Sequence, residues 1–283
     1  MSLLDVPRST YYARKAAEEA RQDPANAKPR GRPPLVPDDA LLAAIQRVIA
    51  ESPFVGEGHK KVHVRLRLAG VRATVTRVLR IMRENGLLAP TRLGNAHGPK
   101  AHDGSITPSR PDEIWGTDMT QTLLESGLNA AIFAVVDHAT SECLGLFAAE
   151  RGRRFEAVEA LRQAVHHRGL KADKDALVGV KLRHDHGSQF IAEYFQKEVT
   201  FLGMTSSPAF VREPQGNGTA ERFFRTLKEN LLWLRRFSDV ASLQVALDEF
   251  RLSYNVRWLI GRHGYVSPTE QHRRLLAKVS QAA

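Results

Sequence analysis

The sequence predicts an α/β protein in which a mixed sheet is flanked by helices and preceded by a small all-helical segment. Between residues 111 and 240, short apolar or alternating segments come in the order strand-strand-strand-helix-strand-helix-strand-helix. Residues 39–85 instead show helical periodicity. Residues 1–110 carry 19 Lys and Arg against 10 Asp and Glu, whereas the remainder carries 22 against 21. The front segment is therefore either a polyanion-binding module or only a solvated basic surface.

The front of the chain reads as one helix followed by a linker. Ser9 is a typical N-cap for a helix that continues to about Arg21. Residues 23–37 hold five of the fourteen prolines, which favours an extended linker. We therefore expect residues 1–37 to be an N-terminal helix and a proline-rich linker.

Residues 38–90 are expected to form a helix-turn-helix. Helices are predicted over Asp39–Glu51, about Lys60–Leu68 and Ala73–Asn85, with a turn at Gly70. The last helix has one apolar face and several arginines off that face: Arg77, Arg80 and Arg83. Such arginines can bind phosphates and guanine edges, which predicts DNA binding. The alternative is an ordinary helical subdomain with a solvated basic face. Residues 91–107 are expected to be a second linker.

The larger part of the chain supplies the predicted sheet. Strands are expected over Ile114–Leu124, Asn129–His138 and Cys143–Ala149, joined by turns at residues 125–127 and 139–141. The remaining elements are a helix over Phe155–His167, a strand over Ala176–Asp185, a helix over Gln189–Leu202, a short strand over Met204–Ser206, a helix from Ala220 and a C-terminal helix around Leu243–Tyr254.

Three carboxylates fall on separate predicted elements of this part. Asp118 lies in the first strand, Asp185 follows the strand after the first long helix, and Glu221 lies 36 positions later near the start of another helix. Oxygen ligands of this kind suit magnesium, and a pair of ions can clamp the attacking and leaving oxygens of a phosphodiester. A lone Asp in a turn is ordinarily a helix cap or a solvated residue. The prediction of a metal site therefore depends on the three carboxylates together, in this order and at this spacing. Asp112 and Asp137 are expected to be structural.

Composition narrows the classes of protein further. The single cysteine, Cys143, excludes an internal disulfide and a thiolate-cage zinc site. The longest apolar run, Ala130–Val136, is too short to span a bilayer. We therefore expect a cytoplasmic protein without a membrane segment.

The motifs resemble a known group of enzymes. Three segments are similar to the catalytic core of retroviral integrases and insertion-sequence transposases. They are the Trp-Gly-Thr-Asp118 strand, the His-Asp185-His-Gly-Ser-Gln-Phe turn and the Gly-Asn-Gly-Thr-Ala-Glu221-Arg-Phe-Phe-Arg-Thr-Leu-Lys segment. The front half and the ending, from Tyr254-Asn255 to Ser267-Pro268-Thr-Glu270, resemble second-reading-frame transposases of the insertion sequence three family. Gly218-Thr219-Ala220 departs from the Asp-Asn-Ala that is frequent in that family, and the histidine/cysteine zinc module of retroviral integrases is absent from the sequence.

The resemblance implies an RNase H-like core over residues 108–240 and a C-terminal helical extension over 241–283. It implies a DNA transposase in which Asp118, Asp185 and Glu221 hold two Mg²⁺ ions, with Mn²⁺ able to substitute. The implied partners are double-stranded DNA, both transposon ends and target, further copies of the chain in a homo-oligomer on that DNA, and an upstream-frame product. The implied setting is a bacterial cytoplasm, with action at the nucleoid.

Two basic residues follow Glu221 along the same predicted helix face. Arg225 lies one turn and Lys228 two turns further on, where each could reach a DNA phosphate or simply be solvated. Residues 207–218 are expected to be a mobile loop that orders around substrate. Two other functions remain open: an RNase H-like nuclease that cuts without joining, and a domesticated DNA-binding protein or repressor without activity.

Overall fold

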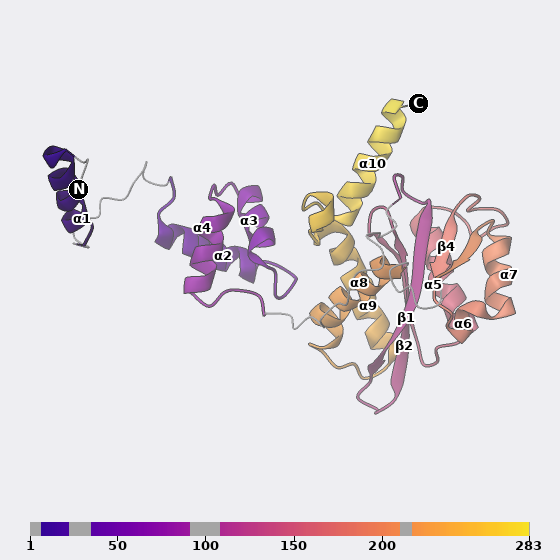
Figure 1. Ribbon diagram of the computed structural model, residues 1–283. Coiled ribbons are helices and arrows are strands. Elements are labelled where there is room, and N and C mark those ends of the chain that lie inside the picture. The colour runs from indigo at the N-terminus through magenta and orange to yellow at the C-terminus, as the bar shows by residue number, and fades with distance from the viewer. Residues whose placement is uncertain (1–6, 23–34, 91–107, 210–216, 283) are drawn as a thin grey trace, which may run out of the picture.

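The computed structural model describes residues 7–22, 35–90, 108–209 and 217–282 (Figure 1). Most of the two expected linkers, and residues 210–216 of the expected mobile loop, lie outside these ranges. The described part contains helix α1 (Arg8–Gln22), a compact helical segment (α2–α4) and an α/β core. Helix α1 begins one residue earlier than expected, so Ser9 lies inside the helix and is not its cap.

A five-stranded mixed sheet forms the centre of the core. Its strands are β1 (Ile114–Leu123), β2 (Asn129–Asp137), β3 (Cys143–Ala149), β4 (Lys181–His184) and β5 (Thr205–Pro208), in the order β3-β2-β1-β4-β5. Strands β1, β2 and β3 pair antiparallel through short turns, whereas β4 and β5 run parallel to β1. This arrangement confirms the predicted fold class.

Helices cover both faces of the sheet, which explains why β2 reads as a continuous apolar run. Alternate residues of β2, such as Ile132 and Ala134, belong to the core beneath α8 (Gly218–Leu227), its π-helical continuation η3 (Lys228–Leu232) and α9 (Val240–Arg257). Their neighbours, such as Phe133 and Val135, belong to the core beneath α5 (Arg154–His167) and α7 (Glu193–Phe201).

Helix α9 closes the free edge of the sheet at β3. An uncovered edge strand would present unpaired backbone groups. Asn255 accepts from the Cys143 N–H and donates to the Cys143 carbonyl, both at 2.8 Å. Gln244 accepts from the Ala148 N–H at 2.7 Å. Helix α9 therefore completes the same hydrophobic core as α8. The predicted boundary between the core of residues 108–240 and the extension of residues 241–283 falls inside this hydrophobic core. The domain ranges stay predictions.

Two predicted elements differ in the structure for local reasons. The strand expected from residue 176 begins only at Lys181, because the preceding Gly179 has φ of +89°, which a strand does not accommodate. The helix expected over residues 189–202 breaks at Ala192 into α6 (Ser188–Ile191) and α7, since Ala192 is extended (φ −60°, ψ 136°). The break lets Phe190 and Phe195 pack together with their ring centroids 5.4 Å apart.

The helical segment has a small core of its own. Helices α2 (Asp38–Ala50), α3 (His59–Leu68) and α4 (Val75–Glu84) bury apolar residues against one another, among them Leu41, Leu66 and Met82. Thr74 caps α4 by accepting a hydrogen bond from the Arg77 N–H at 3.3 Å. The sequence predicted an apolar face of Val75, Val78, Leu79 and Met82 on α4. The structure buries Val78 and Met82 together with Ile81, and leaves Val75 and Leu79 half-buried.

The chain ends in a further helix, α10 (Pro268–Ala282), after the short 3₁₀ turn η4 (Gly261–His263). Figure 1 shows the outer part of α10 extending away from the core. Across the described ranges, no helix combines the length and the apolar character needed to cross a lipid bilayer.

Candidate active site

The strand register brings Asp118 and Asp185 to neighbouring positions. Strands β1 and β4 are parallel, with Gly116 opposite Arg183. Asp118 lies two residues beyond that pair within β1, and Asp185 lies two residues beyond it, directly after β4 ends, so both come at the same end of this strand pair. Asp118 also pairs with Ala134 of β2, which belongs to the core beneath α8 and α9. Asp118 therefore lies on the face of the sheet covered by α8, and Asp185 is near enough for its charge to act on Asp118.

Close packing of α8 on β1 brings the third carboxylate to this face. Asn217, the N-cap residue of α8, is buried and donates from Nδ2 to the Thr117 carbonyl at 3.0 Å. Gly116 gives the helix room, because a Cβ atom there would lie 2.7 Å from Asn217 Oδ1. Glu221 follows in the first turn of α8. Sequence reasoning overlooked both Gly116 and Asn217, although a glycine within a strand is a known signal of close approach.

Electrostatic interactions connect the three carboxylates. Burial, together with the negative charges of Asp185 and Glu221, raises the pKa of Asp118 to about 6. The Met119 N–H, which donates to Asp118 Oδ1 at 2.7 Å, acts in the opposite direction, as does the charge of Lys228. Burial also raises the pKa of Glu221, against the effect of Arg222.

The three acidic side chains provide only oxygen donors, which suits a hard divalent cation. Asp185 stabilises the loop after β4, because its Oδ1 accepts a hydrogen bond from the Gly187 N–H at 2.9 Å. Within the described ranges, no three His, Cys, Asp or Glu side chains lie close enough together to hold one metal ion. The three carboxylates are thus electrostatically connected but do not converge on one point.

The two basic residues expected on α8 have different surroundings. Lys228 is half-buried, and its charge lowers the pKa of Asp118, so it belongs to the carboxylate site electrostatically. It stands where α8 gives way to the π-helical turn η3. Arg225 is exposed and pairs with Glu229 at 3.1 Å.

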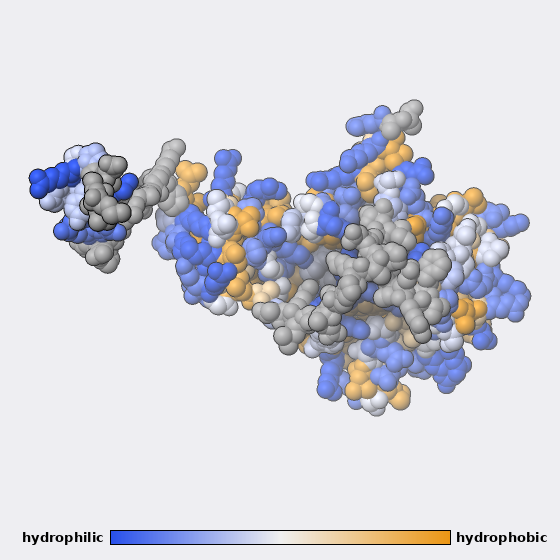
Figure 2. Space-filling view, viewed as in Figure 1, coloured by the Kyte–Doolittle hydropathy of each residue, from blue (hydrophilic) through white to orange (hydrophobic). Residues whose placement is uncertain are grey.

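The structure gives the arginines of α4 partners that the sequence did not reveal. Arg77 donates from Nε to Asp38 at 2.8 Å, and Arg80 binds Asp38 at 2.6 Å and Glu84 at 2.8 Å. Arg83 is exposed and, among the described residues, forms no ion pair. Two of the three predicted DNA contacts therefore compete with ion pairs inside the segment. Figure 2 shows a largely hydrophilic surface over much of this segment.

Asp112 and Asp137 have structural roles, as expected. Asp137 is buried and accepts from the Asp112 N–H and the Thr140 N–H, at 2.8 and 2.7 Å. Asp112 accepts from Trp115 Nε1 and from Arg168 Nε, each at 2.8 Å. These contacts fix the start of β1 and the turn between β2 and β3.

The two histidines beside Asp185 differ from each other. His184 is buried, and its Nε2 lies 2.9 Å from Ser206 Oγ on β5. His186 is exposed, and its Nε2 lies 2.7 Å from the Ala209 carbonyl oxygen. The first contact ties the end of β4 to β5, and the second ties the loop after β4 to the residue that follows β5.

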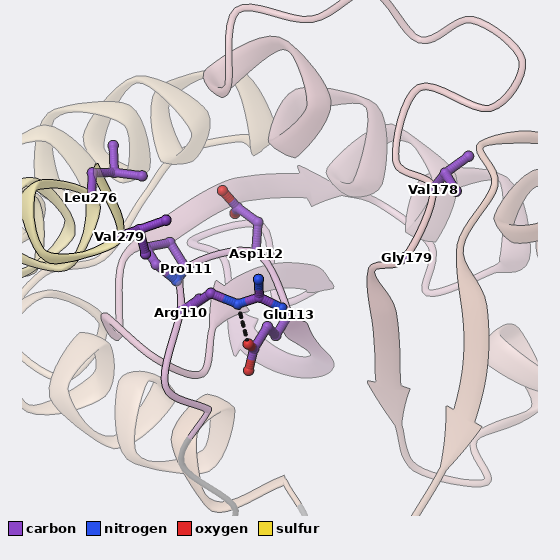
Figure 3. Close-up of a pocket in the computed structure, with 8 residues that line it drawn as sticks. All are labelled: Arg110, Pro111, Asp112, Glu113, Val178, Gly179, Leu276 and Val279. Carbon is purple, nitrogen blue, oxygen red and sulfur yellow. Dashed lines mark hydrogen bonds and ion pairs between the residues drawn. The ribbon is translucent and has the colours of Figure 1, made fainter. Parts of the chain in front are cut away.

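A pocket of about 290 Å³ lies elsewhere on the core (Figure 3). It is lined by residues 110–113, which precede β1, by Val178 and Gly179 before β4, and by Leu276 and Val279 of α10. None of the three site carboxylates lines it. The candidate active site is therefore the acidic surface beside β1, β4 and α8.

Comparisons with known proteins bear on the family and the fold. The integrase core domain family matches residues 202–268, a range that includes Glu221 but neither aspartate, and the HTH-like domain family matches residues 37–93. The InsD transposase for insertion element IS2A/D/F/H/I/K of Escherichia coli is 27% identical over 242 residues, which cover 84% of this chain and 79% of that protein. InsD for insertion element IS2-9 of Escherichia coli K12 is 27% identical, covering 84% and 78%.

A solved structure shares the fold. One chain of the simian T-cell lymphotropic virus intasome in complex with the PP2A regulatory subunit B56 gamma is similar with a TM-score of 0.51 and 22% sequence identity. The similarity covers 74% of the present chain and 70% of that chain. At this level of identity the comparison shows a shared fold.

Proposed function

We propose that this chain, an insertion-sequence transposase with an integrase-like core, cuts and joins DNA through Asp118, Asp185 and Glu221 acting with divalent metal ions. The observation that carries the proposal is the shared acidic site: like charges on Asp185 and Glu221 raise the pKa of the buried Asp118. Clustering three carboxylates costs repulsion, which a bound cation would remove.

The chemistry divides between the metal and the protein. Two Mg²⁺ ions, replaceable by Mn²⁺, would polarise a phosphodiester and lower the pKa of the attacking hydroxyl. Asp118 of β1, Asp185 directly after the neighbouring strand β4, and Glu221 in the first turn of α8 would supply the ligands; the pairing of β1 with β4 and the packing of α8 on β1 support this role. A modest movement of these side chains would bring them together on the ions. Water attack on a phosphodiester at the transposon end would break its bond to the 3′ oxygen and free a 3′-hydroxyl. That hydroxyl would then attack a target phosphodiester, forming a new phosphorus–oxygen bond as the target's own 3′ oxygen leaves.

Basic residues next to the carboxylates would hold the DNA. Lys228 acts electrostatically on Asp118, which supports a role for its ammonium group beside the scissile phosphate. Arg225 would bind a neighbouring phosphate by leaving its exposed pair with Glu229, because such pairs are weak. Arg83 is free to contact DNA, whereas Arg77 and Arg80 would first have to exchange Asp38 for phosphate.

The wider arrangement follows from the same function. The helix-turn-helix of residues 38–90 would bind transposon ends, and the core of residues 108–240 with its extension 241–283 would perform the reaction. A second copy on the paired ends and an upstream-frame product are the proposed protein partners. The proposed place of action is the bacterial nucleoid.

Oligonucleotide assays in different metals test this proposal. Duplexes carrying the sequences that flank the gene should be cut and then joined to a second duplex in Mg²⁺ or Mn²⁺. Ca²⁺ should support binding with little turnover, because its longer and more variable coordination aligns the reacting groups poorly. Products are resolved on denaturing gels. Cutting without joining would indicate the nuclease alternative, and binding alone would indicate the repressor alternative. Joining with every metal chelated would refute the metal-dependent mechanism.

A further inference from the structure

The loop between α2 and α3, residues Glu51–Gly58, inserts a side chain into the other part of the molecule. We call residues 51–58 the docking loop. Phe54 is only 4% exposed and belongs to the hydrophobic core beneath α8 and α9, not to the core of the helical segment. Its ring makes edge contacts with Phe250 and Trp258, with centroid separations of 6.4 and 4.8 Å. Phe54 thus joins the helical segment to the α/β core.

Polar contacts surround this aromatic anchor. The Val55 N–H donates to Asn230 Oδ1 at 2.9 Å, and Arg65 Nη2 donates to the Arg257 carbonyl at 3.2 Å. Lys61 Nζ lies 2.9 Å from the centroid of the Trp258 ring. A cation over an indole ring is a favourable contact. The contacts come from the docking loop and α3 on one side and from η3 and the end of α9 on the other.

The docking loop is braced from within. Phe54 N–H donates to Ser52 Oγ at 3.2 Å, and Ser52 Oγ donates to Glu57 at 2.9 Å. Glu57 is buried and also binds Arg65 of α3 through two hydrogen bonds. A buried carboxylate paired in this way fixes the loop on α3. The anchor is therefore rigid with respect to the helical segment, whose core α3 shares with α4.

Asn230 connects the docking loop to the helix that carries Glu221. It lies in η3, the π-helical turn directly after α8, where the wider turn disturbs the usual i to i−4 hydrogen bonds. Asn230 Nδ2 donates to the Thr226 carbonyl of α8 at 2.9 Å, while its Oδ1 accepts from Val55. One amide thus bridges the loop and the catalytic helix. The contacts form a continuous path from α4 through α3 and the docking loop to α8.

We propose that Phe54 and Asn230 are positioning residues, which hold the DNA-binding helices in a fixed register with the three carboxylates. The proposal rests on the proposed function, since it concerns how a bound DNA end is presented to that site. Cleavage requires the reacting atoms to be placed within a fraction of an ångström, so a loosened connection between binding and cutting parts slows the reaction. Binding of the DNA end is expected to come mainly from the helical segment, and the phosphate contacts proposed for Lys228 and Arg225 are unchanged by a loosened loop.

The test uses the full chain with Phe54→Ala, the conservative Phe54→Leu, and Val55→Ala as a matched control. The Val55 side chain is 53% exposed, and the control keeps the backbone N–H that binds Asn230. Hydrogen–deuterium exchange of residues 51–58 and 226–232 reports docking, thermal unfolding reports the global fold, and duplexes with the flanking sequences report end binding and end cleavage. Phe54→Ala should speed exchange in both segments. It should lower the cleavage rate at saturating DNA by roughly 10- to 100-fold, because misplacement of about 1 Å has effects of this size.

The dissociation constant for the DNA end should stay at the wild-type value in Phe54→Ala, because α4 is unchanged. Phe54→Leu should restore most of the cleavage rate, and Val55→Ala should match wild type in every assay. Unchanged exchange in Phe54→Ala would refute the anchor, and faster exchange with a normal cleavage rate would refute the positioning role. If Phe54→Ala unfolds globally, Asn230→Ala takes its place with the same expected results. A wild-type chain that does not cut would refute the proposed function and with it the coupling, while the exchange data would still decide whether Phe54 anchors the loop.

Discussion

Neutralising any one of the three site carboxylates should abolish DNA cleavage and joining while leaving DNA binding intact. The variants are Asp118→Asn, Asp185→Asn and Glu221→Gln, each of which keeps the size of the side chain. Metal ions contribute several kcal/mol of transition-state stabilisation in such chemistry, and each 1.4 kcal/mol is about tenfold in rate. Losing one ligand should therefore lower the cleavage rate by about a thousandfold or more. Gel assays in Mg²⁺ measure the products, and fluorescence anisotropy measures binding.

The same variants should not lose stability. Asp118 is buried beside two other acids, which raises its pKa to about 6, so its charge is unfavourable at neutral pH without a cation. Asp118→Asn removes that charge and should unfold at a temperature no lower than wild type. Glu193→Gln serves as the control, because Glu193 is an exposed carboxylate paired with Lys197 on α7. Near wild-type joining by any of the three site variants would exclude that residue as a ligand.

Replacing Arg168 by Met should have the largest effect on folding. Arg168 stands at the end of α5 with its side chain 10% exposed, and it binds Glu142 at 2.6 Å and Asp112 at 2.8 Å. Removing one partner from a buried ion pair costs about 3–5 kcal/mol, because the remaining charge is left without compensation. Urea denaturation of Arg168→Met at pH 7 should show a loss of this size in the free energy of unfolding.

A matched variant on the same helix separates this network from ordinary surface pairs. Arg162 pairs with Glu159 and Glu198 and is 39% exposed, so Arg162→Met should cost about 1 kcal/mol or less. Equal effects of the two variants would contradict the special role of Arg168.

The Arg168 network should also make stability depend on pH. Burial alone would raise the pKa of Glu142, but His167 and Arg168 outweigh it and lower that pKa to about 2. The folded pKa thus lies below the unfolded value of about 4.5. The stabilisation is fully present above about pH 4.5 and is lost as the pH falls towards 2. The difference between wild type and Arg168→Met should shrink across this window.

The order of the elements could be predicted because it depends on local patterns. Strand β2 is apolar on both faces, and the turns on either side of it are short and polar, so the three-stranded antiparallel part of the sheet was evident. The spacing and flanking residues of Asp118, Asp185 and Glu221 likewise indicated one site, and the pairing of β1 with β4 brings the two aspartates to the same end of neighbouring strands.

Features that arise from tertiary packing could not be predicted from local sequence patterns. Phe54 lies in a short loop without periodicity, so nothing in its neighbourhood indicated that it fills a core formed by residues nearly 200 positions away. The break at Ala192 reflects the need to bury Phe190 and Phe195 together. Asp38 belongs to another helix, and only the folded segment shows that it binds Arg77 and Arg80.

Locating bound metal tests the central claim most directly. Crystals of the full chain grown with Mn²⁺ should show anomalous scattering from two ions, about 3.5–4 Å apart, between Asp118, Asp185 and Glu221. Asp118→Asn crystals prepared in the same way should lose at least one of these ions. The wild-type chain must bind and cut DNA in the same Mn²⁺ buffer. If its crystals then show no manganese at this site, or manganese only at other residues, the assignment of these three carboxylates is contradicted.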